Sequence, residues 1–213
     1  SGSSALVLLS PRETILITDF RYEIQVAAEV GSVARVVIEP VSLWAALWQQ
    51  LQSLSGVHVI GFESPHLPHR DFQRLIEAGS RWQWRPTVDL VERQRECKDA
   101  GEISCIKRAT EVAARALERT LPSVHAGSSE LALAGVLERA LRDEGSEGFP
   151  FPSIVAAGAR AALPHAQPTS HRVAAGDFLL FDFGAVVDGY CSDVTRTVVV
   201  GRASAEQREF YDV

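Results

Sequence analysis

The sequence predicts an α/β N-terminal domain over residues 1–88, followed over residues 89–213 by a domain of the α+β class. In the first part, short β-branched runs alternate with amphipathic segments, which is typical of α/β domains. The second part begins with a long helical stretch and ends in β-rich segments. With 46% hydrophobic and 23% charged residues, the 213-residue chain has an ordinary globular composition and is long enough for two cores.

Strands are predicted in the first part where short apolar runs are bounded by Ser, Pro or Gly. They cover residues 5–9, 14–18, 35–39 and 57–62. Two helices are predicted, at 42–54, where leucines recur at helical spacing, and at 68–79, which ends at Gly79, a residue suited to a C-cap. The tryptophans of this part are interpreted as core residues; they are Trp44, Trp48, Trp82 and Trp84.

Two helices are predicted to open the second part. Residues 91–121 are strongly helical, with an apolar stripe formed by Ile103, Ile106, Ala113, Leu117 and Leu121. A second helix is expected to begin around Ser128, an acceptable N-cap, and to run to Gly145. The charged residues of both helices, including Glu130 in the first turn of the second, are interpreted as solvated faces.

The β-rich end of the chain contains FPFPSIVAAG (149–158), DFLLFDFG (177–184) and GYCSDVTRTVVVG (189–201). Asp188-Gly189 is a strong hairpin signal between the last two segments. If residues 187 and 188 form the loop, Asp182 lies directly opposite Asp193. If residues 188 and 189 form it, the two aspartates are diagonal neighbours. In both registers they project from the same face of the hairpin.

Two carboxylates roughly 5 to 8 Å apart on adjacent strands repel each other unless a cation lies between them. Hard divalent ions prefer oxygen ligands, and a carboxylate can chelate one ion or bridge two. The residues alone leave two interpretations open. Asp182 and Asp193 are half of a metal site, or they are paired with Arg196 or with a cation from elsewhere. Asp188 belongs to the turn, where Asp is favoured for backbone reasons.

Composition disfavours several classes of partner. The net charge is −6 and Lys and Arg are dispersed, which argues against nucleic acid. No run approaches the roughly 18 apolar residues of a membrane helix, and no secretory signal is present, so a cytoplasmic protein without membrane association is expected.

Cys97, Cys105 and Cys191 form no CxxC pair, which fits free thiols and disfavours structural zinc. The chain contains no methionine, so a processed chain or a piece of a longer one is expected.

The aspartate hairpin resembles the first metal-ligand motif of the pita-bread metallopeptidases, in their aminopeptidase P and prolidase branch. That motif has an Asp in D-x-G, here Asp182, and a second Asp eleven residues later in G-Y-x-x-D-x-T-R-T, here Asp193. SIVAAGARAALPHAQP resembles a segment of the same branch with a histidine seventeen residues before the first Asp, here His165. The resemblance implies that Asp182 and Asp193 bind metal and that His165 contacts substrate.

The rest of the chain resembles the same branch. VERQRECKDAGEISCIKRAT is similar to its linker helix, and Asp19, Arg21 and Tyr22 match an Asp-x-Arg-Tyr motif of its N-terminal domain. A creatinase/prolidase-type N-terminal domain over residues 1–88 and the N-terminal half of a pita-bread domain over residues 89–213 are therefore implied. The family's remaining His, Glu and Glu ligands, and its general-base Glu, would lie beyond Val213. The chain is expected to be truncated at both ends and inactive alone.

The resemblance implies hydrolysis of Xaa-Pro bonds in dipeptides or oligopeptides by a water that two divalent ions activate. The ions are most often Mn²⁺, with Co²⁺ or Zn²⁺ as alternatives, and homodimers are expected. Dipeptidase, aminopeptidase and carboxypeptidase activities stay open. Methionine aminopeptidases are disfavoured because they have Gly where this chain has Ala166. Two further interpretations stay open: a metal-independent creatinase-like hydrolase, and a non-catalytic module that binds peptide or protein.

Overall fold

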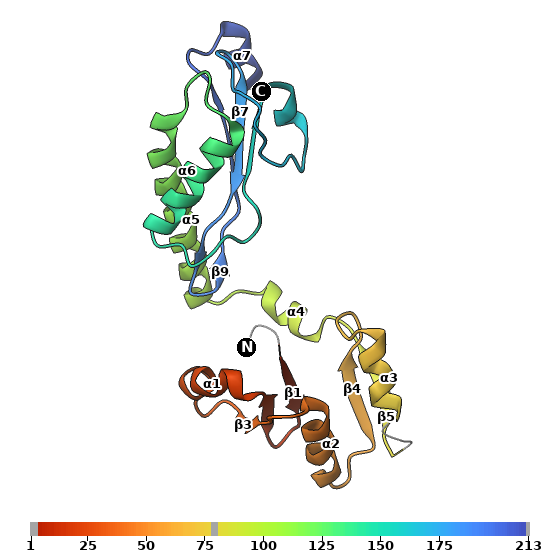
Figure 1. Ribbon diagram of the computed structural model, residues 1–213. Helices are drawn as coiled ribbons and strands as arrows, with labels where there is room; N and C mark the ends of the chain where they lie inside the picture. The colour runs from red at the N-terminus through yellow and green to blue at the C-terminus, as the bar shows by residue number, and fades with distance from the viewer. Residues whose placement is uncertain (1–3, 78–80, 212–213) are drawn as a thin grey trace. The chain divides into compact units, whose positions relative to one another are not determined.

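The computed structural model describes residues 4–77 and 81–211 (Figure 1). The chain divides into two compact units, Ser1–Gln94 and Arg95–Val213. This division lies a few residues beyond the boundary predicted between residues 88 and 89, inside the helix α4 (Leu90–Glu96). Each unit is described on its own below.

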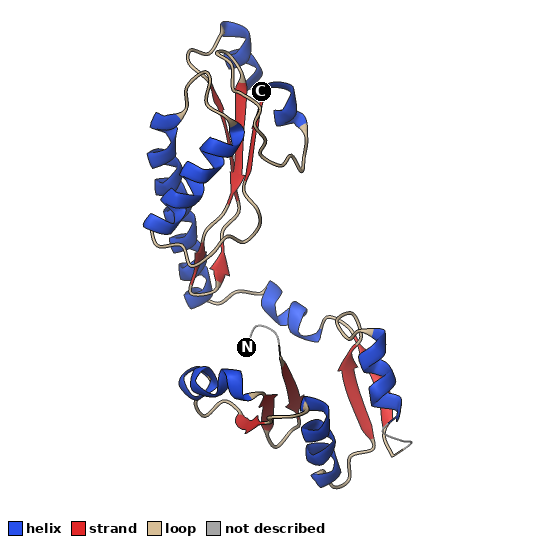
Figure 2. Cartoon of the chain, in the orientation of Figure 1, coloured by secondary structure: helices blue, strands red, loops and turns tan. Residues whose placement is uncertain are grey.

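The first unit contains two small sheets with helices between their strands (Figure 2). Its strands are β1 (Ala5–Leu9), β2 (Thr14–Thr18), β3 (Arg35–Ile38), β4 (Val59–Glu63) and β5 (Gln83–Thr87). Its helices are the 3-10 turn η1 (Phe20–Tyr22), α1 (Glu23–Glu29), α2 (Leu43–Ser53) and α3 (His69–Glu77). β2 pairs antiparallel with β1 and parallel with β3, and β4 pairs parallel with β5.

The predicted strands and helices of this unit are confirmed within the described residues, whereas β5 and α1 were not predicted. Pro86 argues against a strand at this position, because proline has no N–H to donate to a neighbouring strand. β5 accommodates Pro86 because it lies at the edge of its two-stranded sheet. The predicted cap Gly79 lies outside the described residues. Trp82 is buried in the core with Ile15, Ile17 and residues of α2, and the other tryptophans pack against it, as predicted.

The second unit is a three-stranded antiparallel sheet with two long helices on one face (Figure 1). The sheet order is β10-β7-β6, and β8 and β9 form the tip of the β7–β10 hairpin. The strands are β6 (Ile154–Ala157), β7 (Phe178–Phe183), β8 (Val186–Val187), β9 (Tyr190–Cys191) and β10 (Val194–Val199). The helices are α5 (Ala100–Thr120), η2 (Leu121–Ser123), α6 (Glu130–Asp143), η3 (Gly158–Ala162) and α7 (Ala205–Tyr211).

The core of this unit lies between the sheet and helices α5 and α6. Leu179, Phe181 and Phe183 of β7 alternate with more accessible residues and pack into the same cluster as the buried residues of both helices. The predicted stripe on α5 is partly wrong, because Ile103 is 43% exposed and Leu121 is 37% exposed. Helical periodicity gives the direction of the buried face, but the packing partners decide which turns are covered.

The prediction of one helical stretch over residues 91–121 is also wrong, because α4 ends at Glu96 and α5 begins at Ala100. A capping box starts α5: the Asp99 carboxylate accepts from the Glu102 N–H at 2.9 Å, and Glu102 accepts from the Asp99 N–H at 2.7 Å. The other Glu102 oxygen accepts the Tyr190 hydroxyl at 2.9 Å, which raises the pKa of Tyr190. Among the described residues, no helix is long and apolar enough to cross a bilayer.

Candidate metal and substrate site

The hairpin register places the two predicted metal ligands diagonally across β7 and β10. Thr195 pairs with Asp182, and Tyr190 pairs with Val187, so residues 188 and 189 form the loop. Asp188 has φ 50° and Gly189 has φ 75°, as the favoured two-residue turn requires. The register with Asp182 directly opposite Asp193 is therefore wrong, and the diagonal alternative is confirmed.

Asp182 lies near the end of β7, the central strand of the sheet, and is half-buried. Its side chain leaves the face opposite the helices, because its neighbours Phe181 and Phe183 point into the helical core. Its Oδ1 accepts a hydrogen bond from the Thr195 hydroxyl at 3.0 Å. Asp193 is exposed, and its carboxylate has no hydrogen bond or ion pair with any residue that the structure describes. Diagonal positions on paired strands lie roughly 7 to 8 Å apart. At this separation the two carboxylates can bind one common metal ion or two neighbouring metal ions.

Arg196 does not neutralise the aspartates. It follows Thr195 on β10, so its side chain leaves the opposite face of the strand from Thr195 and Asp182. Its Nη1 donates to the carbonyl of Thr195 at 2.7 Å. Among the described residues it forms no ion pair with Asp182 or Asp193, so the structure gives no support to pairing of the aspartates with Arg196.

The hairpin strands approach each other very closely beside the aspartates. A Cβ on Gly184 would lie 2.0 Å from the carbonyl oxygen of Ser192 and 2.6 Å from Cγ of Pro150, so only glycine fits. The Ser192 hydroxyl is buried, accepts from the Ala185 N–H at 3.0 Å and donates to the carbonyl of Ala109 on α5 at 3.2 Å. These contacts fix the backbone next to Asp193 against a long helix.

The tip of the hairpin is held independently of the aspartate pair. The Glu147 carboxylate accepts from the N–H groups of Asp188 at 2.6 Å and Gly189 at 3.1 Å. The Asp188 carboxylate pairs with Arg108 of α5. Asp188 therefore has turn and ion-pair contacts of its own, as a structural residue would.

His165 lies in the loop after η3 and is exposed. The next residue, Ala166, is buried and packs with Ile154, Ala156 and Leu180. Leu180 leaves β7 on the same face as Asp182, because the two are separated by two positions. The structure thus brings the His165 segment to the face of the sheet that carries Asp182.

The fit of a divalent ion can be judged from the donors present. Asp182 and Asp193 supply the hard oxygen ligands that Mn²⁺ and similar ions prefer. Within the described residues, no group of three or more His, Cys, Asp and Glu side chains is placed to hold a metal ion. The two aspartates therefore fit half of a site, and a complete coordination sphere needs further ligands.

Glu130 contradicts the prediction of a solvated face, because it is fully buried at the start of α6. Burial alone would raise its pKa, but hydrogen bonds from the Ala157 N–H, from Thr169 and from Arg160 outweigh burial and lower it. A sequence signal for this burial exists: Glu130 is on the helical stripe of the buried Leu133, at the spacing i and i+3.

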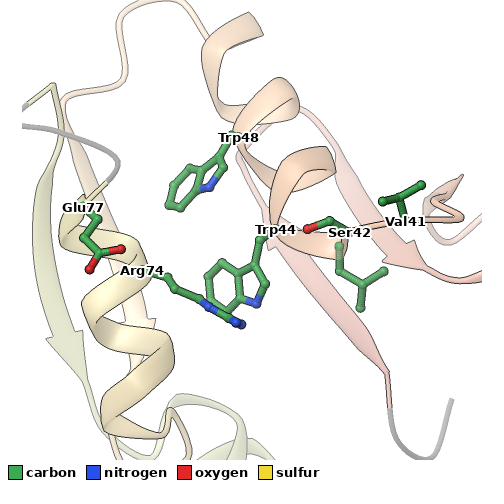
Figure 3. Close-up of a pocket in the computed structure, with 7 residues that line it drawn as sticks. Val41, Ser42, Trp44, Trp48, Arg74 and Glu77 are labelled. Carbon is green, nitrogen blue, oxygen red and sulfur yellow. The ribbon is translucent and has the colours of Figure 1, made fainter.

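A pocket of about 550 Å³ lies elsewhere, in the first unit between α2 and α3 (Figure 3). Trp44 and Trp48 point from α2 toward Arg74 of α3, whose guanidinium carbon is 5.7 Å from a ring centroid of Trp44. The lining residues are Val41, Ser42, Leu43, Trp44, Trp48, Arg74 and Glu77. None of the predicted site residues lines this pocket, so it does not mark the candidate site.

Comparison with protein families gives two matches that together cover most of the chain. Residues 104–213 match the model of metallopeptidase family M24. Residues 1–97 match the creatinase/prolidase N-terminal domain. The order of the two matches is the order of the two units.

Individual proteins match along the whole chain. An uncharacterized peptidase of Bacillus subtilis, YqhT, is 33% identical over 213 residues, which are 100% of this chain and 60% of that protein. The structure of an Xaa-Pro dipeptidase from Bacillus anthracis is 34% identical with a TM-score of 0.91, over 100% of this chain and 59% of that one. An X-Pro aminopeptidase from Thermotoga maritima is 34% identical with a TM-score of 0.87, over 99% and 58% of the two chains. The chain thus spans about 60% of the length of curated relatives.

Proposed function

Because this chain belongs to metallopeptidase family M24, we propose that the native full-length protein is a metal-dependent peptidase that hydrolyses Xaa-Pro bonds. The observation that carries the proposal is the hairpin on which Asp182 and Asp193 lie diagonally, on a sheet face shared with the His165 segment. The relatives named as an Xaa-Pro dipeptidase and an X-Pro aminopeptidase support the proline specificity.

In this proposal Asp182 and Asp193 hold two divalent ions, Mn²⁺ before Co²⁺ or Zn²⁺. When bound, such ions lower the pKa of a water molecule and polarise the scissile carbonyl. Thr195 holds the Asp182 carboxylate in place through its 3.0 Å hydrogen bond. His165 contacts the substrate and either orients it or stabilises its developing charge.

The remaining parts of the site are proposed to come from sequence beyond Val213. They are a His and two Glu ligands, together with a Glu that serves as general base. We therefore expect the 213 residues alone to lack activity. Dipeptides and longer proline-containing peptides both remain candidate substrates. Homodimer formation and a cytoplasmic location stay predictions.

The proposal is tested on the native full-length polypeptide. After chelation and dialysis, hydrolysis of Ala-Pro, a longer Ala-Pro peptide and Ala-Ala is measured with Mn²⁺, Co²⁺, Zn²⁺ or no metal. We expect metal-dependent cleavage of an Xaa-Pro substrate. Asp182→Asn and Asp193→Asn should each abolish cleavage and lower the bound metal, whereas Asp188→Asn, in the same hairpin, should retain both.

Each competing function gives a different result. Cleavage that survives chelation would favour a metal-independent hydrolase, and peptide binding without turnover would favour a non-catalytic module. Equal cleavage of Ala-Ala and Ala-Pro would remove the proline specificity. Activity of the 213 residues alone would contradict the need for ligands beyond Val213.

A further inference from the structure

We infer that Glu130 is a positioning residue for substrate binding, because its buried carboxylate ties together both ends of the loop that carries His165. This inference rests on the proposed function, in which His165 contacts substrate. Its support is the set of contacts made by one carboxylate. Glu130 itself is fully buried in the first turn of α6, so its carboxylate is not accessible to substrate or metal.

The carboxylate joins two points of the chain that flank His165. Oε1 of Glu130 accepts from the N–H of Ala157, the last residue of β6, at 3.0 Å. Oε2 accepts from the N–H of Thr169 at 3.0 Å and from its hydroxyl at 2.7 Å. The segment between Ala157 and Thr169 is therefore closed at its base by a single side chain.

Arg160 adds a second connection inside this loop. Its Nε donates to both carboxylate oxygens of Glu130, at 3.0 and 3.2 Å. Its Nη2 donates to the carbonyl of Gln167 at 2.7 Å. Because Ala166 is buried and the Gln167 carbonyl is held, the backbone is fixed immediately after His165.

Helix α6 provides the rigid base for these contacts. The N–H of Leu131 donates to the carbonyl of Thr169 at 3.0 Å, and the N–H of Glu130 donates to the carbonyl of His171 at 3.1 Å. The loop end therefore satisfies amides that the first turn of a helix otherwise leaves unpaired. Glu130 and Thr169 hold each other through both backbone and side chain.

Within the part of the chain that the structure describes, the Glu130 carboxylate accepts hydrogen bonds from Ala157, Thr169 and Arg160. Holding both ends of the loop therefore requires two acceptor oxygens, and the negative charge strengthens these bonds. A Glu130→Gln substitution keeps the size but turns one acceptor oxygen into a donor amide that faces other donors. At least one end of the loop is then released. The aspartates lie on the β7–β10 hairpin, outside this hydrogen-bond network, so their position should not change.

The test compares three variants of the native full-length enzyme with wild type: Glu130→Gln, Thr169→Val and the control Glu138→Gln on the same helix. KM and kcat for an Ala-Pro substrate, bound metal, and amide hydrogen exchange over residues 158–168 are measured. For Glu130→Gln we expect about a tenfold higher KM, a smaller change in kcat, unchanged metal, and faster exchange in the loop. Thr169→Val should shift KM and exchange in the same direction by less, and Glu138→Gln should change neither.

Several results would overturn the inference. Metal and activity lost in parallel in Glu130→Gln would mean a general structural role, and so would a fall in kcat with KM unchanged. Loop exchange equal to that of Glu138→Gln would mean that Glu130 does not hold the loop. If Glu130→Gln does not fold, an unchanged KM and loop exchange in Thr169→Val contradicts the inference. A wild-type protein that does not cleave Xaa-Pro bonds would contradict the proposed function instead. The difference in loop hydrogen exchange between wild type and Glu130→Gln would still be present in that case, so the two failures can be distinguished.

Discussion

The Thr195 hydroxyl donates a hydrogen bond of 3.0 Å to Oδ1 of Asp182, across the paired strands β10 and β7. This contact occupies one lone-pair direction of a proposed metal ligand and fixes the rotation of its carboxylate. Groups that hold a ligand in this way typically affect metal affinity about 10- to 100-fold. Substituting Thr195 therefore tests directly whether the Asp182 carboxylate is held in position to bind metal.

Thr195→Val should lower the affinity of the full-length protein for Mn²⁺ about tenfold, because valine keeps the shape but removes the donor. Isothermal titration of the metal-free protein measures the change. Thr197→Val is the matched control, because Thr197 lies on the same face of β10 but pairs with Leu180. Equal affinities of the two variants would show that the hydroxyl does not position the ligand.

Gly184→Ala should destabilise the protein by about 3 kcal/mol, because the added Cβ collides with backbone rather than with a movable side chain. Urea unfolding followed by circular dichroism measures the loss. Gly135→Ala on α6 is the control: nothing lies within 4 Å of its added Cβ, and alanine should stabilise the helix by up to about 1 kcal/mol. A neutral Gly184→Ala variant would mean that the strands do not approach this closely.

Two buried serines should respond differently to alanine. Ser192→Ala should cost about 1 to 3 kcal/mol, because it leaves the buried N–H of Ala185 without its acceptor. Ser153→Ala should cost little or stabilise the protein, because the Ser153 hydroxyl is buried with no hydrogen-bond partner among the described residues. Equal unfolding free energies for the two variants would contradict these contacts.

Glu130 should make stability depend on pH in the acid range. Its folded pKa lies below the usual value of 4.5, so the unfolded state binds the proton more readily and stability falls as pH drops. The contribution of Glu130 is fully present above about pH 4.5 and disappears as pH falls through the folded pKa. The difference in unfolding free energy between wild type and Glu130→Gln should therefore shrink between pH 7 and pH 3. A constant difference would show that the carboxylate is not stabilised in the folded state.

The hairpin could be predicted from sequence because its signal is local. Asp188-Gly189 supplies the turn, and the alternation of β7 places Asp182 on the face away from the core. The sequence could not choose between the two registers, since both keep Asp182 and Asp193 on one face. Strand pairing settled the choice by placing Thr195 opposite Asp182.

The features that escaped prediction depend on distant partners. Glu130 shares a helical stripe with the buried Leu133, but nothing in the sequence indicates which groups surround its carboxylate. Those groups belong to Ala157, Arg160 and Thr169, which lie 27 to 39 residues further along the chain. The break before α5 is different, because Asp99 and Glu102 have the spacing of a capping box and could have been recognised.

The start of α6 also has a consequence for the order of folding during synthesis. Its first amides are satisfied by carbonyls of Thr169 and His171, and Thr169 follows Glu130 by 39 residues. When the residues of α6 are synthesised, these acceptors have not yet been made. Helices α5 and α6 can pair early through local contacts, but the first turn of α6 must wait for the loop that carries His165. The beginning of α6 should therefore be among its last parts to become ordered.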